Sequence, residues 1–300
     1  MNTHITEPTP MAFSIIGCGR VGTHLAVFLE KSGFVPASFS SRSLTSAQGT
    51  CRTVGKGVVV PAVEDAAKMA DMIFLATPDM EIESVCETIA AKGGFSSHHK
   101  VFHLSGALGS DILSSAKKAG AATGSIHPLQ AFVPYQEGQD SPFTGIHMGI
   151  EGDETAVCLG EKIVTALGGT SFVMPTSAKV LYHAAAVTAS NYLVTLVHAS
   201  LQMMQQTGLD AFQAYHLLEP LIQGSLENIK TKGTVKGLTG PISRGDFPII
   251  EGHLKNMEAQ LPELVELYRI LGHYTLELAR QGKGLDEKDG QILARLLLRK

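Results

Sequence analysis

The sequence has little of what several kinds of framework and binding site require. Its four cysteines are Cys18, Cys51, Cys86 and Cys158, which are far apart and form no C-x-x-C pair. This spacing predicts neither a disulfide framework nor a metal site, and it favours a cytoplasmic location, where thiols stay reduced. Lysine and arginine form no cluster larger than a pair, and the formal net charge is −4. We therefore do not expect nucleic acid binding.

Two further stretches lack features that would target the chain to a membrane. Residues 1–10 have neither a basic region nor an apolar core, so we predict a disordered tail there rather than a signal peptide. Residues 184–209 carry no formally charged side chain, and a membrane-spanning helix needs roughly 20 apolar residues. Polar residues such as Thr188, Asn191 and His198 nevertheless interrupt this stretch. A helix buried inside protein is the better interpretation, and we expect no membrane partner.

The length of 300 residues predicts two domains. Short apolar runs alternate with helical patterns up to about residue 174, which predicts an α/β domain with a Rossmann-type, doubly wound parallel sheet over residues 11–174. The predicted strands are 12–16, 35–39, 57–60, 72–76, 101–104, 122–126, 147–150 and 170–174. No strand pattern follows Pro175, so residues 175–300 are expected to form an all-helical domain. Its predicted helices are 177–206, 210–230, 250–281 and 286–299.

The segment IIGCGRVG (15–22) ends the first predicted strand and opens a helix. In this context a G-x-G-x-x-G pattern is typical of dinucleotide binding. Gly17 makes the turn, Gly19 lets a pyrophosphate approach the backbone, and Gly22 lets the helix pack on the strand. Arg20 and Val21 lie at the first free N–H groups of the helix, which favour phosphate. A glycine-rich turn without a ligand is the alternative.

The end of the second predicted strand indicates which dinucleotide is bound. An NAD site usually offers a carboxylate there, whereas this chain offers Ser41, Arg42 and Ser43. An arginine flanked by hydroxyls suits a 2′-phosphate, so NADP(H) is the predicted cofactor. The alternative is an exposed loop arginine. Thr77 and Pro78, in LATPD (75–79), either line the cofactor's path or form a turn at the end of a strand.

Candidates for the reacting end come from two loops and from the long helix. Ser105 in HLSGALG and His127 in SIHPLQAF each follow or end a predicted strand, although a helix cap and a turn explain them equally well. Lys179, His183 and Asn191 are spaced by four and eight residues, which places them near one helix face. Hydrogen bonding inside the core is the alternative for the histidine and the asparagine.

A polar loop, LTGPISRGD (238–246), lies in the predicted helical domain. Its arginine, Arg244, can form a bidentate bridge to a substrate carboxylate. It can equally pair with Asp246 and order the loop. The residues leave both interpretations open.

These motifs together resemble one bacterial family over nearly the whole chain. The glycine-rich start, the Ser-Arg-Ser loop, HLSG, HPLQAF, YHAAAVTASNYL and LTGPISRGD are similar to those of Rossmann-like proteins with a C-terminal helical domain of unknown function. That family is similar to NADP-dependent ketopantoate and pyrroline-5-carboxylate reductases. More distantly, it resembles deazaflavin-dependent NADP reductases and prephenate dehydrogenases.

The resemblance to ketopantoate reductases implies roles for residues of the long helix. In those enzymes the helix carries a catalytic lysine followed by asparagines four and eight residues later. His183 occupies the lysine position here, Asn191 the second asparagine position and Val187 the first. The resemblance implies that His183 is the acid–base group, and that Asn191 and Ser105 orient the substrate oxygen. Val187 departs from the pattern, which puts the substrate in doubt.

The predicted function is NADP(H)-dependent hydride transfer to or from a small carbonyl compound or hydroxy acid, in the cleft between the two domains. We expect the substrate to carry a carboxylate that Arg244 holds, with His127 also contacting the substrate. Long apolar helices in the second domain favour a homodimer. Two alternatives remain: a ketopantoate reductase proper, and a non-catalytic NADP-binding sensor or partner-binding module.

Overall fold

The computed structural model describes residues 11–282 and 284–298, so the tail predicted for residues 1–10 lies outside the described part of the chain. The chain divides into two compact units, a sheet unit that ends at Ser190 and a helical unit that begins at Asn191. This division falls inside helix α7 (Lys179–Gln205), whereas the sequence analysis placed the change of domain at residue 175. The first turns of α7 group with the sheet unit because Lys179 is buried there.

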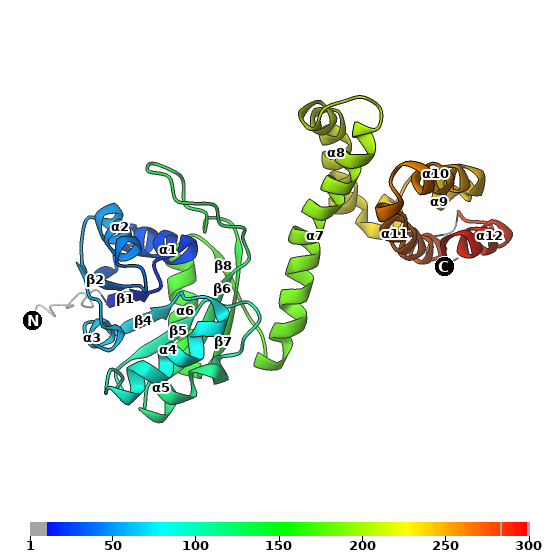
Figure 1. The fold of residues 1–300 in the computed structure, drawn as a ribbon. Helices are drawn as coiled ribbons and strands as arrows, with labels where there is room; N and C mark the ends of the chain where they lie inside the picture. Colours follow the sequence, from blue (N-terminus) through cyan, green and yellow to red (C-terminus); the bar gives the residue numbers. More distant parts are fainter. Residues whose placement is uncertain (1–10, 283, 299–300) are drawn as a thin grey trace, which may run out of the picture. The chain divides into compact units, whose positions relative to one another are not determined.

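An eight-stranded sheet forms the centre of the sheet unit (Figure 1), in the order β3-β2-β1-β4-β5-β6-β7-β8. Neighbouring strands are parallel except for β6 and β7, which pair antiparallel. The strands are β1 (Ala12–Ile16), β2 (Val35–Ser40), β3 (Val58–Val59), β4 (Met72–Leu75), β5 (Lys100–His103), β6 (Ala122–Pro128), β7 (His147–Gly152) and β8 (Thr170–Val173). The predicted Rossmann-type, mostly parallel sheet is confirmed.

Helices cover both faces of this sheet, which explains its continuous apolar strands. Phe13 and Ile15 of β1 pack with α1 and α6 on one face, whereas Ile16 packs with α4 on the other. The ribbons of α1 and α2 accordingly lie on the opposite side of the sheet from α4 and α5 (Figure 1). The helices are α1 (Arg20–Lys31), α2 (Leu44–Val54), α3 (Val63–Lys68), α4 (Asp79–Ala91), α5 (Ser114–Lys118) and α6 (Glu154–Ala166), with short 3₁₀ turns at Ser110–Leu113 and Thr176–Ala178.

The helical unit has its own small core and no strand among its described residues, which confirms the predicted helical region. Besides the end of α7 it contains α8 (Ala211–Gly237), α9 (Pro241–Arg244), α10 (Phe247–Gln260), α11 (Pro262–Arg280) and α12 (Glu287–Leu298). The single helix predicted over 250–281 is two helices, because Pro262 starts a new helix at its first turn. Pro241 likewise begins a short helix inside the predicted loop 238–246.

Helix α7 differs from the expectation that it is buried. The stretch Thr176–Gln205 is long and apolar enough to cross a membrane by length and composition alone, with a mean hydropathy of 1.3. None of its most apolar window is buried in the single chain, so the predicted burial is wrong for one copy. Val180, Leu181, Tyr192 and Val194 are each more than half exposed along this helix. The physical reason is that neither unit, taken by itself, covers these side chains.

Candidate functional site

A cavity of about 680 Å³ opens in the sheet unit beyond the ends of β1, β2 and β4. Its volume lies within the range of about 300–1,000 Å³ that is typical of small-molecule and cofactor pockets. The residues that line it are Ile16, Gly17, Cys18, Gly19, Arg20, Val21, Ser41, Arg42, Ser43, Ser46, Pro61, Val63, Ala76, Thr77, Pro78, Glu81 and Val85. The structure therefore brings together all of the predicted cofactor residues except Gly22.

Two of the three glycines are required by close packing. Gly17 has a φ of +106°, and a Cβ on it would lie 2.5 Å from the backbone of Ala76. A Cβ on Gly22 would lie 2.1 Å from the carbonyl oxygen of Gly17, so Gly22 packs behind the turn rather than in the cavity. Gly19 has open space in front of it. This is the arrangement that lets a ligand approach the backbone at Gly19.

Polar groups at the cavity lack a hydrogen-bond partner among the described residues. The first N–H groups of α1, from Arg20 onward, have no acceptor within the helix, and such a helix start favours phosphate. The Thr77 hydroxyl oxygen is buried and has no hydrogen-bond partner in the described part of the chain. Leaving such a group unpaired costs about 1–3 kcal/mol. These residues fit a bound dinucleotide phosphate.

Arg42 extends into solvent at the same cavity. Its side chain is 90% exposed, and its guanidinium lies 3.9 Å from the carboxylate of Glu81. Ser43 is used differently, because its hydroxyl caps α2 by accepting a hydrogen bond from Ser46 N–H at 3.3 Å. Glu81 belongs to the first turn of α4 and also lines the cavity.

A second group of polar residues lies where β5 and β6 end, and we call it the β5–β6 cluster. Its members are Asp79, Ser105, Gly106, His127, Lys179, Tyr182 and His183, all within the sheet unit. The Ser105 hydroxyl donates to Asp79 Oδ2 at 2.7 Å and accepts from the N–H groups of Ala107 and Leu108 at 3.1 Å. Ser105 therefore orders its own loop, in line with the helix-cap alternative. Its predicted contact with substrate stays a prediction.

His127 connects the end of β6 to the start of α7. Its Nδ1 is hydrogen-bonded to the Tyr182 hydroxyl at 2.7 Å, and its ring centroid lies 6.1 Å from that of His183. Both imidazoles pack over Gly106, because a Cβ there would lie 2.6 Å from His127 Nε2 and 2.7 Å from His183 Cδ2. Burial lowers the pKa of His127 to about 4, and positive Lys179 adds to the shift. His127 is therefore neutral at physiological pH.

Lys179 is the buried charge of this cluster, with 1% of its surface exposed. Its ammonium donates to the Ser105 carbonyl at 2.7 Å and to the Ser125 hydroxyl, and it lies 3.7 Å from Glu151 Oε1. Glu151 in turn accepts hydrogen bonds from Ser110 and Thr176. Burial lowers the pKa of Lys179 to about 8, against the opposing effect of Glu151.

The structure thus places Ser105, His127 and His183 together, as the sequence analysis selected them. Sequence reasoning did not assign a role to Tyr182 or Asp79, and it grouped Lys179 with His183 without identifying its partners. The signal for Tyr182 was its position directly before His183 in the motif YHAAAV. Asp79 gave a weaker signal, as the acidic residue that closes LATPD.

Two predicted site residues belong to the helical unit. Asn191 is exposed on α7, at the first position of that unit. Arg244 ends α9 and pairs with Asp246, whose Oδ2 lies 2.9 Å from its Nε and 2.8 Å from its Nη2. This pair is the loop-ordering alternative that the sequence left open. The substrate contacts of Asn191 and Arg244 stay predictions.

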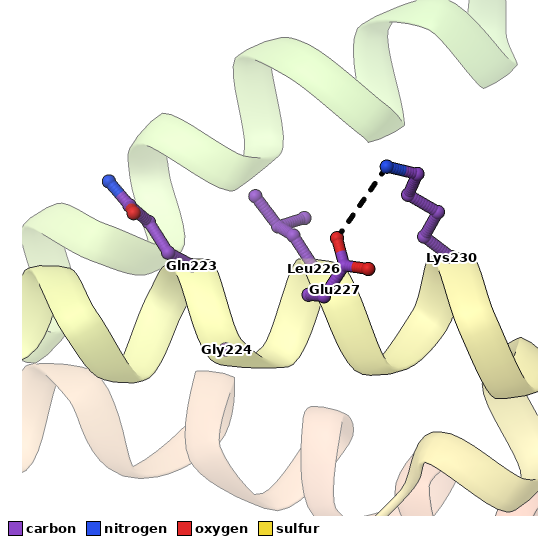
Figure 2. Close-up of a pocket in the computed structure, with 5 residues that line it drawn as sticks. All are labelled: Gln223, Gly224, Leu226, Glu227 and Lys230. Atoms are coloured by element: carbon purple, nitrogen blue, oxygen red, sulfur yellow. Dashed lines mark ion pairs between the residues drawn. The ribbon is translucent and has the colours of Figure 1, made fainter.

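The helical unit also carries an open hollow of about 520 Å³ along α8, shown in Figure 2. It is lined by Gln223, Gly224, Leu226, Glu227 and Lys230, and the last two form an ion pair at 3.7 Å. Both charges are more than half exposed, so the hollow lacks the buried polar groups that define the cavity and the β5–β6 cluster.

Two models of known protein families match this chain. A Rossmann-like domain matches residues 2–128, and a Domain of unknown function (DUF2520) matches residues 146–275. The resemblance to Rossmann-like proteins with a helical domain of unknown function is thereby confirmed. No curated protein gave a significant match.

Solved structures share the fold. Protein BF3122 of Bacteroides fragilis is 19% identical, with a TM-score of 0.74 over 90% of this chain and 98% of that chain. Protein TM1727 of Thermotoga maritima is 29% identical, with a TM-score of 0.68 over 90% of this chain and 98% of that chain. A reductive aminase of Aspergillus terreus, solved with NADPH and ethyl-5-oxohexanoate, is 17% identical, with a TM-score of 0.64 over 95% of this chain and 98% of that chain.

The Lys179–Glu151 pair predicts a specific stability effect. Lys179→Met leaves the buried Glu151 carboxylate without its cation, which costs about 3–5 kcal/mol in the free energy of unfolding. Urea unfolding followed by circular dichroism measures this loss. Adding Glu151→Gln removes the stranded charge and should restore part of the stability.

The matched control is Lys117→Met, which breaks the ion pair of an exposed lysine with Asp153. Exposed pairs contribute about 1 kcal/mol or less, so this variant should unfold close to the wild type. A Lys179→Met variant as stable as the control would show that the buried charge does not organise the sheet unit.

Proposed function

We propose, from the premise that this chain joins a Rossmann-like domain to a DUF2520 domain, that it is an NADP(H)-dependent oxidoreductase. The observation that carries the proposal is the cavity in which the glycine turn, the start of α1 and Arg42 meet. The cavity lies beyond the carboxyl ends of parallel strands, where open α/β sheets bind their ligands. NADPH in the solved reductive aminase supports the choice of cofactor.

The residues present fit the predicted cofactor. Gly19 and the N–H groups at the start of α1 would hold the pyrophosphate, and the Thr77 hydroxyl would gain the partner that it lacks. Arg42, beside Ser41, would hold the 2′-phosphate. Bound NADPH would supply a hydride to the substrate.

The β5–β6 cluster supplies the protein groups for the reaction. His183 is the proposed acid–base group, because its ring lies beside that of His127 over Gly106 and histidine is the residue that most often transfers protons in enzymes. His127 contacts the substrate beside it. Ser105 reaches the substrate only if its hydroxyl leaves Asp79, so its role is better described as ordering the loop that carries Gly106.

For the substrate we propose a small carbonyl compound or hydroxy acid, with Arg244 binding its carboxylate and Asn191 orienting its oxygen. Ketopantoate is one such substrate, although Val187 departs from the ketopantoate reductase pattern. Arg244 already pairs with Asp246, so it must share or leave that partner to bind a substrate.

A compound with a C=N bond is a second candidate. Asp79 is an exposed carboxylate in the β5–β6 cluster, whereas the cation of the cluster, Lys179, is buried and bonded. An exposed carboxylate favours a positively charged iminium group over an anionic keto acid. The similarity of fold to a reductive aminase supports the same choice.

The partners that we propose are a small-molecule substrate and a second copy of this chain, in the cytoplasm, rather than nucleic acid or a membrane. Large apolar side chains are exposed on both long helices: Val180, Leu181, Tyr192 and Val194 on α7, and Phe212, Leu217, Leu221, Leu226 and Ile229 on α8. Large exposed apolar patches on a soluble protein often mark an interaction surface. A symmetric dimer would cover it.

Nucleotide binding tests the cofactor assignment. Wild-type protein should bind NADPH more tightly than NADH, because Arg42 pairs with the 2′-phosphate. Arg42→Ala removes a charge-assisted interaction of about 1.5–3 kcal/mol, so its Kd for NADPH should rise about 10- to 150-fold. The Kd for NADH should change little. Fluorescence titration measures both constants.

Arg52→Ala is the matched control, since Arg52 is exposed on α2 and does not line the cavity. It should bind both nucleotides as the wild type does. Failure of the wild-type protein to bind either nucleotide would overturn the proposed function at its first step.

Turnover tests the substrate class and His183 together. We expect oxidation of NADPH, followed at 340 nm, with one member of a panel of keto acids and cyclic imines. His183→Ala should lower kcat by about 10²- to 10⁴-fold, the usual contribution of general acid–base catalysis, while NADPH affinity is retained. His198→Ala, an exposed histidine further along α7, serves as the control.

Full turnover by His183→Ala would remove its role as the acid–base group. Tight NADPH binding without turnover on any compound would favour the non-catalytic NADP-binding module.

Sedimentation velocity tests the homodimer. The wild-type chain should sediment as a dimer, and the double variant Leu217→Glu/Leu221→Glu should sediment as a monomer, because it places charge on the apolar surface of α8. Leu298→Glu, at an exposed leucine on α12, should remain dimeric. A monomeric wild-type protein at micromolar concentration would contradict the proposal.

A further inference from the structure

The hydrogen bond between Tyr182 and His127 fixes more than the position of the ring. The two rings meet edge to face with centroids 5.4 Å apart, and the Tyr182 hydroxyl lies 2.7 Å from His127 Nδ1. Tyr182 comes from the first turn of α7, and His127 from the end of β6. The bond therefore joins the helix to the strand end that carries the cluster's imidazole.

The direction of this hydrogen bond follows from comparing the two possible donors and the two possible acceptors. Burial raises the pKa of Tyr182 to about 12, so its hydroxyl keeps its proton. A neutral imidazole has one N–H donor and one bare nitrogen. Either direction leaves one donor without a protein acceptor among the described residues, Nε2–H if Tyr182 donates and the hydroxyl proton if Nδ1–H donates. A phenol O–H is a stronger donor than an imidazole N–H, and a bare imidazole nitrogen is a stronger acceptor than a phenol oxygen. The pair therefore favours Tyr182 as the donor and Nδ1 as the acceptor.

The charged and titratable groups around His127 favour the neutral ring. Lys179 and His183 face it from α7, Asp79 from α4, and buried His103 from β5. The Lys179 ammonium is held in place by the Ser105 carbonyl. Its positive charge opposes a second positive charge on the imidazole, and its effect exceeds that of Asp79.

The other ring nitrogen, Nε2, has no protein partner in the described part of the chain. It packs over Gly106, where a Cβ would come within 2.6 Å of it, and the ring of His183 lies on the same glycine. Any side chain at position 106 would therefore displace one of the two imidazoles. Nε2 and His183 are left side by side at the proposed reacting end.

We propose that Tyr182 is a positioning residue that holds His127 in the tautomer with its proton on Nε2. His127 is then a neutral hydrogen-bond donor to the reacting oxygen or nitrogen of the substrate. It gives up no proton, so the proton that the reduced product gains comes from His183. This division of roles rests on the proposed function, whereas the tautomer of His127 does not.

Nitrogen-15 NMR of the histidine side chains tests the tautomer without any substrate or nucleotide. At pH 7 the His127 signals, assigned by their loss in His127→Asn, should show a protonated Nε2 and a bare Nδ1. Tyr182→Phe should give a mixture of the two tautomers. A protonated Nδ1 in the wild-type protein, or an unchanged tautomer in Tyr182→Phe, would overturn the inference.

Kinetics tests the consequence. Tyr182→Phe should lower kcat about 10-fold, the effect of about 1.4 kcal/mol, with KM and the NADPH Kd nearly unchanged. Tyr274→Phe, which alters an exposed tyrosine of α11, should leave all three constants as they are. An unaltered kcat in Tyr182→Phe, in a protein that turns over, would refute the positioning role. A protein that turns over nothing refutes the proposed function but leaves the tautomer measurable in the wild type.

Discussion

The ammonium of Lys179 is a full charge held out of water, and its partners come from three separate segments. The Ser105 carbonyl follows β5, the Ser125 hydroxyl lies on β6, and Glu151 lies on β7. A buried charge without partners is too costly to tolerate, so these segments must meet at this point. Ser125 and His127 share one face of β6, because side chains two residues apart point the same way. The buried lysine therefore also sets the place of the imidazole.

The first turn of α4 connects the nucleotide cavity to the β5–β6 cluster. Asp79 accepts the hydrogen bond of the Ser105 hydroxyl. Glu81, two residues further along the same turn, lies 3.9 Å from the guanidinium of Arg42. Pro78, which precedes them, lines the cavity. A displacement of this turn would alter the loop beneath His127 and the surroundings of the guanidinium together. The two regions are thus joined by one short, rigid segment.

Sequence patterns predicted the sheet and the cavity well, because both depend on local rules. Apolar runs identify buried parallel strands, and the glycine spacing identifies the turn at Gly17. Glu81 was missed because nothing in its spacing shows that α4 passes beside the end of β2. Tyr182 was missed for the same reason, since helical spacing predicts which residues share a face and not what lies opposite. The burial of α7 was overestimated, because an uncharged helix looks the same whether its own chain or a second copy covers it.

Helix α7, which is 27 residues long, carries residues of the β5–β6 cluster as well as an exposed apolar surface. Its first turn carries Lys179, Tyr182 and His183 and is tied into the sheet unit by hydrogen bonds, whereas much of the remaining surface is apolar and exposed. An α-helix is stiff along its axis, since each turn is bonded to the next. Whatever covers the apolar surface of α7 therefore contacts the same helix that holds His127 through Tyr182. The position of this one helix, rather than the chemistry of any single residue, couples the proposed assembly of the protein to its proposed reaction.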